Sequence, residues 1–263
     1  MSTNMFSLDR KVAIITGGNG GIGLGIAVGL GNAGAKVVIA ARDKPKIEYA
    51  LAKLKDHNIE SLGIETDVTD DESISNLVNK TLEVFGRLDI LVNNAGVSKR
   101  KFPQEITSDE WSHILNVNLT GVFKCSKEVY IPMVKAGSGK IINIGSMTSI
   151  FGQDYTAPYA ATKGGVVQLT KSLANAWARN NIQVNSILPG WVETDLTLDL
   201  RSSKEFKERY ELISARIPSG RWGQPSDLAG TAVFLASHAS NYITGCLLYT
   251  SDAADDTPCV DLG

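Results

Sequence analysis

Three polar residues near the middle of the chain have types and spacing that suit proton transfer. Tyr159 and Lys163 lie four positions apart in a helical pattern, so their side chains would share one face of a helix. A neighbouring ammonium lowers the pKa of a phenol, and a tyrosine that exchanges protons near neutral pH needs its pKa lowered by about 3. Ser146 follows the apolar run 141–144 and would reach the same phenol from a strand end. Taken singly, these residues also fit structural roles, as a half-buried aromatic, a solvated helix charge and a strand-end cap.

A glycine-rich segment early in the chain predicts a dinucleotide-binding turn. Residues 16–23 read TGGNGGIG, directly after the apolar run 12–15 and before a helical stretch at 24–32. Glycine lets the backbone approach a pyrophosphate closely, and the N-terminus of a helix presents unpaired N–H groups to the anion. A tight turn that only packs the helix against the strand is the structural alternative.

The residues after the second predicted strand favour NADP(H) over NAD(H). Folds that bind the unphosphorylated ribose usually offer a carboxylate about 20 residues beyond the glycines. Here the strand 37–39 leads into Ala-Ala-Arg, and Arg42 can bind a 2′-phosphate with two hydrogen bonds and stack on adenine. Asp43 follows directly and could turn inward, which keeps NAD(H) possible. A solvated loop position is the other interpretation of Arg42.

The apolar pattern predicts an α/β fold. Short β-branched runs at 12–15, 37–39, 90–92, 141–144 and 184–188 alternate with longer helical patterns, which is typical of βαβ units. Because the runs are apolar throughout, we expect a Rossmann-type doubly wound parallel sheet covered by helices on both faces.

The chain shows neither an internal repeat nor a linker, so we expect a single domain over residues 1–250. A polar excursion at 193–222 is expected to form a substrate lid. Within it, Phe206, Tyr210 and Ile213 have helical spacing, which indicates packing more than ligand binding.

Composition excludes several classes of protein. Of 263 residues, 43% are hydrophobic and 21% charged, with a net charge of −2, which fits neither a disordered chain nor a basic nucleic-acid binder. The first eleven residues hold no signal-peptide pattern and no run is apolar enough to span a membrane, so we expect a cytoplasmic protein. The cysteines are far apart and the histidines isolated, which argues against disulfides and metal sites: Cys125, Cys246, Cys259, His57, His113 and His238.

The order of these motifs resembles the short-chain dehydrogenase/reductase (SDR) family over about residues 11–245. Besides the glycine turn, Ser146 and the Tyr159/Lys163 pair, the resemblance rests on Asp67-Val68, Asn93-Asn94-Ala95-Gly96, Asn118 and the run from Pro189-Gly190 to Thr194. It implies a dehydrogenase that transfers a hydride between a nicotinamide and a carbonyl or secondary alcohol.

The resemblance also implies roles for individual residues. Tyr159 would exchange the proton, Ser146 would hold the substrate oxygen, Lys163 would bind the nicotinamide ribose and lower the phenol's pKa, and Asn118 would keep a relay water. Asp67 and Val68 would hold adenine, while Val192 and Thr194 would meet the nicotinamide. The expected cofactor contacts are Gly17, Asn19, Gly21, Ile22, Gly23, Arg42, Asp67, Val68, Asn94, Ala95, Gly96, Tyr159, Lys163, Pro189, Gly190, Val192 and Thr194.

Substrate and assembly are less constrained. The expected walls, 148–155, 191–200 and a helix at 203–216, mix aromatic and polar residues, which suits a polyol, sugar or sugar acid, and the chain looks most like the glucose 1-dehydrogenase and gluconate-type branches. Reduction of 3-oxoacyl thioesters or bulky ketones is the alternative, and a non-catalytic redox sensor is an alternative of another class. The family implies a homotetramer or homodimer through long helices at about 108–135 and 156–180.

Three further segments carry separate expectations. Tyr155 is expected to be a pocket wall at most, because the residue four positions later is a tyrosine and not a lysine. The basic run 99–101 would attract an acidic substrate or carrier protein, or else form a solvated loop. The stretch 246–256 resembles a reading frame of a sequencing-library adapter, so we expect 251–263 to be a non-native tail, while 246–250 can still pair as a strand.

Overall fold

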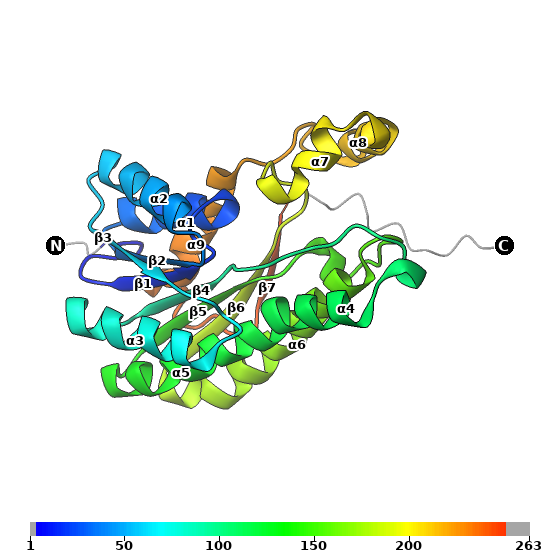
Figure 1. Ribbon diagram of the computed structural model, residues 1–263. Helices are drawn as coiled ribbons and strands as arrows, with labels where there is room; N and C mark the ends of the chain where they lie inside the picture. Colours follow the sequence, from blue (N-terminus) through cyan, green and yellow to red (C-terminus); the bar gives the residue numbers. More distant parts are fainter. Residues whose placement is uncertain (1–3, 251–263) are drawn as a thin grey trace.

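The computed structural model, which describes residues 4–250, contains the parallel sheet that the sequence predicted (Figure 1). Its strands are β1 (Val12–Thr16), β2 (Lys36–Ala41), β3 (Ser61–Glu65), β4 (Ile90–Asn93), β5 (Gly139–Ile144), β6 (Ile182–Leu188) and β7 (Leu247–Tyr249). They lie in the order β3-β2-β1-β4-β5-β6-β7, and every neighbouring pair is parallel. Strands before β4 are added on one side of β1 and later strands on the other, so the topological switch point lies between β1 and β4. Open α/β sheets bind ligands at this point.

Two layers of helices cover the sheet (Figure 1). The helices α1 (Gly21–Asn32), α2 (Lys44–Asp56) and α9 (Ala229–Ala236) pack on one face, and α3 (Asp71–Phe85), α5 (Gly121–Ala136) and α6 (Ala157–Trp177) on the other. Successive strand residues alternate between the two cores: Ile15 joins the first and Ile14 the second, both fully buried. Of the described helices, none has both the length and the apolar character to cross a membrane.

Two boundaries differ from the sequence prediction. The helix α1 begins at Gly21, three residues before the predicted start at Leu24, because its first turn consists mainly of glycines that carry no periodic apolar signal. The edge strand β3 was not among the predicted strands, and of its residues only Ile64 is buried. The predicted strand at 246–250 is present as β7, and the tail predicted to be non-native, 251–263, lies outside the described residues.

The long helix predicted at 108–135 is present with a local widening. The helix α4 (Ser108–Leu115) runs through a π-helical turn at Asn116–Thr120 directly into α5. A π turn inserts one residue into a helix and often marks a functional site. Here it carries Asn118, whose side chain is fully buried.

The excursion at 193–222 forms a separate helical flap over the carboxyl ends of the strands, seen at the top right of Figure 1. It contains α7 (Leu198–Ser202) and α8 (Lys207–Arg216), so the helix predicted at 203–216 is shorter and follows a 3-10 turn at Lys204–Phe206. A backbone bridge between Val192 and Gly223 joins the two ends of the flap. Its apolar stripe packs inward: Phe206, Tyr210 and Ile213 lie against a cluster that contains Trp222.

One buried carboxylate joins the amino ends of the central strands β1 and β4. Asp89 precedes β4, is 4% exposed, and accepts hydrogen bonds from the Val12 N–H (3.0 Å), the Lys11 ammonium (3.1 Å) and the Arg87 guanidinium (2.6 Å). Burial alone would raise its pKa, but the bonds from Arg87 and Val12 and the charge of Lys11 hold the pKa below its usual range.

We expect Asp89→Asn to lower the free energy of unfolding at pH 7 by about 2 kcal/mol, because the donors around it lose a charged acceptor. Since the folded-state pKa is depressed, this stabilisation is present above the unfolded value of about 3.9 and is lost as pH falls through the folded value. Denaturant unfolding of wild type and variant at pH 7 and near pH 3 measures both effects. The exposed Asp56→Asn is the control, and equal stability of Asp89→Asn and wild type at pH 7 would contradict the assignment.

Candidate active site

A cavity of about 880 Å³ opens at the carboxyl ends of β1, β2, β4, β5 and β6, beneath the flap. It lies at the point where the strand order reverses, as expected for a ligand site of an open α/β sheet. Its lining divides into a glycine turn, a region after β2 and β3, a polar centre at β5 and α6, and walls from the flap.

The glycine turn is tied to the segment after β4. The Asn94 side-chain amide donates to the carbonyls of Thr16 (3.1 Å) and Gly17 (2.9 Å), and the Thr16 hydroxyl accepts from the N–H groups of Asn94 and Ala95 (3.1 Å each). A Cβ on Gly17, which has φ +62°, would lie 2.9 Å from the Ala95 Cα, and one on Gly23 would lie 2.4 Å from the Asn94 amide nitrogen. Both positions therefore require glycine, which lets the turn and the segment after β4 approach each other closely.

The floor fits an anionic dinucleotide. Gly20, the N-cap of α1, lines the cavity with no atom within 4 Å of where its Cβ would be. No side chain caps this end of α1 and its first turn holds no acidic residue, so the helix N-terminus faces open space with its donors unclaimed by side chains. A pyrophosphate suits such a floor.

The region after β2 presents a cation to the cavity. Arg42 is exposed and lines it, while the Asp43 carboxylate caps α2 by accepting from the Lys46 N–H (3.0 Å). Asp43 itself also lines the cavity, so the position that could turn inward combines a place in the cavity wall with this capping role. Asp67 also lines the cavity: burial raises its pKa, but the donors of Thr69 and the charge of Arg42 bring it below the usual value.

Lys163 is the buried cation of the polar centre. Its side chain is 3% exposed, and its ammonium donates to the Ile144 carbonyl (2.6 Å) and lies 5.5 Å from the centre of the Tyr159 ring. Burial lowers the pKa of Lys163 to about 8. Gly96 lies beside this ammonium, since a Cβ at that position would be 3.9 Å from the Lys163 nitrogen, an ordinary contact distance.

Tyr159 and Ser146 meet at the same centre, as the sequence predicted. Burial raises the pKa of Tyr159, while a hydrogen bond with Ser146 and the charge of Arg100 partly offset it. The net direction is upward, which corrects the expectation that Lys163 lowers this pKa in the protein alone. Burial is the larger effect on this pKa, and the Lys163 ammonium is bonded to the Ile144 carbonyl and lies beside the phenol ring. Ser146 also accepts from the Thr148 N–H (3.2 Å), so its strand-end cap and its site position coexist.

Asn118 lies behind the cavity and fixes the loop after β4. Its side-chain oxygen accepts from the Val97 N–H and its amide donates to the Val97 carbonyl, both at 2.8 Å, with a further contact to the Thr162 hydroxyl at 3.3 Å. The side chain thus positions the 94–97 segment. The relay water implied by the family resemblance stays a prediction.

The structure brings nearly all sequence-predicted site residues together. Only Gly23 and Asn118 are absent from the lining, and both support residues that line it. The others form the cavity wall: Gly17, Asn19, Gly21, Ile22, Arg42, Asp67, Val68, Asn94, Ala95, Gly96, Ser146, Tyr159, Lys163, Pro189, Gly190, Val192 and Thr194.

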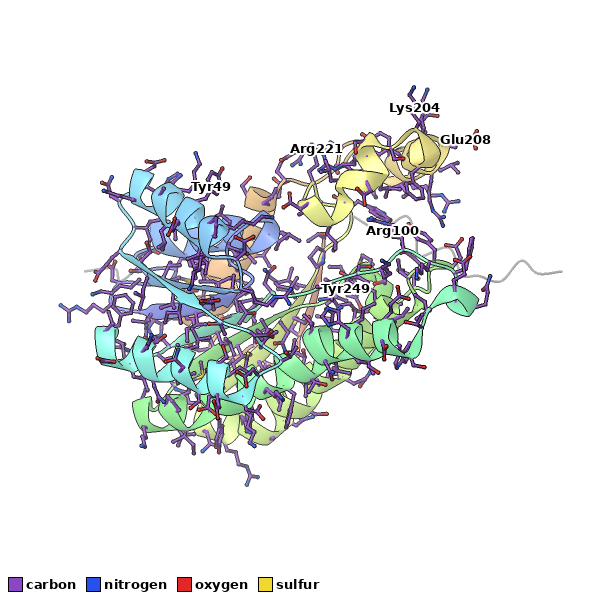
Figure 2. The ribbon with its side chains drawn as sticks, viewed as in Figure 1. Tyr49, Arg100, Lys204, Glu208, Arg221 and Tyr249 are labelled. Atoms are coloured by element: carbon purple, nitrogen blue, oxygen red, sulfur yellow. The ribbon has the colours of Figure 1, made fainter. Side chains whose placement is uncertain are left out.

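The substrate half of the cavity is rich in arginine. Arg100 lines it and points toward the flap, donating to the Leu196 carbonyl (2.7 Å) (Figure 2). Arg209 of α8 bonds to the Asp154 carboxylate (2.5 Å) and stacks 3.7 Å above the Tyr155 ring, which gives Tyr155 its predicted wall role. Arg216 lines the same space. The basic run is therefore split, since Lys99 and Lys101 pair with Glu110 while Arg100 faces the cavity.

The arginines and ion pairs from distant segments were largely missed by sequence reasoning. Arg209, Arg216, Lys46 and Asp195 carry no motif, and their place in the cavity depends on how the flap folds over the strand ends. Arg100 had a signal as part of the basic run, and Asp195, Arg209 and Arg216 fall within the segments predicted as substrate walls, 191–200 and 203–216, whereas Lys46 had none.

Other chemistry is not supported within the described part of the chain. Residues 4–250 contain no group of three or more potential metal ligands. Cys125 and Cys246 are free thiols, burial raises the pKa of Cys125 to about 12, and Cys259 lies outside the described residues.

Comparison with known proteins places these features among dehydrogenases. Residues 11–205 match the model of the short chain dehydrogenase family. The chain is 42% identical to a 2-dehydro-3-deoxy-D-gluconate 5-dehydrogenase of Dickeya dadantii, covering 93% of this chain and 95% of that protein. It is 40% identical to the 5-keto-D-gluconate 5-reductase of Escherichia coli, covering 94% and 96%. A crystal structure of a Burkholderia cenocepacia gluconate 5-dehydrogenase with NADP and tartrate superposes with a TM-score of 0.89 at 38% identity, covering 96% of this chain and 98% of that one.

The Asn94 amide gives a test of the floor geometry. Asn94→Asp keeps the side-chain shape but turns a carboxylate oxygen toward the Thr16 and Gly17 carbonyls. We expect the free energy of unfolding to fall by about 2–4 kcal/mol at pH 7, because two donors are lost and acceptors face one another. Thermal or denaturant unfolding measures this, with the exposed Asn76→Asp as control. A variant as stable as wild type would show that the amide does not hold the turn.

Proposed function

Since this chain belongs to the short-chain dehydrogenase family, we propose that it transfers a hydride between NADP(H) and a carbonyl or secondary alcohol of a small sugar acid. The observation that carries this proposal is the convergence of Ser146, Tyr159 and Lys163 at one cavity, beside an uncapped helix N-terminus. A non-catalytic redox sensor would need the helix terminus but not the proton-transferring side chains.

The nucleotide region supports NADP(H). The donors of α1 suit the pyrophosphate and Arg42 suits a 2′-phosphate, while the carboxylate of Asp43, which also lines the cavity, accepts from the Lys46 N–H as the cap of α2. The Burkholderia cenocepacia relative was crystallised with NADP. NAD(H), which lacks the 2′-phosphate, would leave the Arg42 charge without this partner. When bound, the cofactor supplies or accepts the hydride.

The protein's own residues manage the proton. Ser146 holds the substrate oxygen with its hydroxyl, and Tyr159 gives that oxygen its proton in reduction or removes it in oxidation. Because the pKa of Tyr159 is raised, the phenol is protonated at neutral pH, ready to donate. Lys163 donates one hydrogen bond to the Ile144 carbonyl and has two further N–H donors to bind the ribose hydroxyls. Its charge stabilises the phenolate that forms as the proton leaves.

The substrate region supports an anionic polar substrate. Arg100, Arg209 and Arg216 reach the cavity from different segments, and the described residues place no carboxylate at ion-pairing distance from Arg100. A sugar carboxylate would supply that partner. The substrates named for the relatives are gluconate derivatives, which favours this class over 3-oxoacyl thioesters and bulky ketones.

The remaining expectations belong to the same proposal. We propose a single domain with the flap, residues 193–222, as the substrate lid, working in the cytoplasm as a homotetramer or homodimer. Exposed apolar side chains on α4 and α5, namely Trp111, Phe123 and Ile131, support self-association through these helices.

Tyr159→Phe tests the proton transfer. We expect kcat to fall by about 10³-fold, because the general acid and base is lost, while the Kd for NADP⁺ stays within about twofold, since affinity comes mainly from contacts elsewhere. Steady-state kinetics with a panel of sugar acids and keto-acids, together with cofactor titration, measures both. Tyr49→Phe, exposed on α2, is the control. Retention of more than about a tenth of the wild-type kcat would refute the role of Tyr159.

Arg100→Met tests the anionic substrate class. We expect KM for 5-keto-D-gluconate to rise about 10- to 100-fold, the equivalent of one charge-assisted hydrogen bond. The KM for an uncharged keto-sugar should change little. Lys99→Met removes the neighbouring positive charge, which is paired with Glu110, and serves as the matched control. Equal effects on charged and uncharged substrates would show that Arg100 does not select the carboxylate.

A further inference from the structure

An ion pair links two distant segments of the cavity wall. Lys46, in the first turn of α2, donates to the Asp195 carboxylate at 3.0 Å, although the two residues are 149 positions apart. Asp195 begins the 3-10 turn Asp195–Thr197, which leads into the flap. Both side chains line the cavity.

The pair lies close to both anion-binding features of the cavity. On one side, Lys46 follows four residues after Arg42, which lies between the end of β2 and the N-cap of α2, and both residues line the cavity. On the other side, Thr194 precedes Asp195 and lies against Gly21, whose Cβ would be 3.2 Å from a Thr194 methyl carbon. Lys46 is thus a second cation within the region that suits nucleotide phosphates.

The partnership of Lys46 with Asp195 is easily exchanged. The side chains are 56% and 87% exposed, and ion pairs this exposed contribute little to stability. A phosphate dianion offers more charge and three acceptor oxygens to the same ammonium. Lys44 provides a contrast on the same helix, because it pairs with Glu65 at 2.9 Å but does not line the cavity.

We propose that Lys46 is a second 2′-phosphate-binding residue, and that Asp195 is the partner it leaves when the nucleotide binds. The inference rests on the proposed use of NADP(H). It assigns cofactor selectivity to two cations, Arg42 from the strand end and Lys46 from the helix, and makes Asp195 a competitor of the phosphate.

Direct binding of adenosine half-cofactors tests this without turnover. Isothermal titration of the full chain with 2′,5′-ADP and with 5′-AMP compares ligands that differ only in the 2′-phosphate. We expect Lys46→Met to raise the Kd for 2′,5′-ADP about 10-fold and the Kd for 5′-AMP less than twofold. Asp195→Asn should lower the Kd for 2′,5′-ADP about two- to threefold, since the competing carboxylate is gone. In the Lys46→Met background, Asp195→Asn should have no effect.

Two controls separate this inference from the proposed function. Lys44→Met removes a paired lysine of the same helix and should leave both affinities unchanged, and Arg42→Ala should weaken 2′,5′-ADP selectively. If Arg42→Ala has that effect while Lys46→Met behaves like Lys44→Met, the role of Lys46 is overturned and the cofactor assignment stands. If Lys46→Met raises the Kd for both ligands equally, Lys46 does not contact the 2′-phosphate. If the wild type binds both ligands equally, the NADP(H) assignment fails and this inference fails with it.

Discussion

The site depends on the close crossing of two chain segments at the centre of the sheet. The turn after β1 passes so near the segment after β4 that a Cβ on Gly17 or Gly23 would overlap it, and the Asn94 amide bonds to the turn's carbonyls. Because β1 and β4 are neighbouring strands, this contact fixes where the glycine turn lies relative to Ser146, Tyr159 and Lys163. The position of α1, and with it the anion-binding helix terminus, follows from the same contact.

The second constraint is the buried ammonium of Lys163, which affects the charge states of the polar centre. Lys163 has been taken almost wholly out of water, so its pKa falls to about 8, and the Ile144 carbonyl at the end of β5 satisfies part of its hydrogen-bonding capacity. The same burial raises the pKa of Tyr159, so the two side chains share an environment that disfavours charge on both. A ligand that excludes water and offers hydroxyl groups to Lys163 would strengthen the electrostatic stabilisation of the phenolate.

Charged side chains connect the flap to the rest of the cavity. Arg100 reaches the Leu196 carbonyl, Arg209 reaches Asp154, and Lys46 holds Asp195. These contacts are exposed or half-exposed and individually weak, whereas the flap's own apolar cluster is buried. The flap thus has a buried apolar cluster of its own, while polar side chains make its contacts with Arg100, Asp154 and Lys46.

Local patterns in the sequence were enough to predict the central strands, the glycine turn and the Tyr159/Lys163 helix face. Apolar runs predicted the central strands, the spacing of Tyr159 and Lys163 predicted a shared helix face, and the glycines predicted the turn. The edge strand β3 escaped because its residues are mostly half-exposed and lack the apolar run of a central strand. Three features became visible only in the folded chain: the direction in which the Tyr159 pKa shifts, the capping role of Asp43, and the pairing of Lys46 with Asp195. Burial and contacts between residues far apart in the chain are set by how strands and helices pack, and no local spacing encodes them.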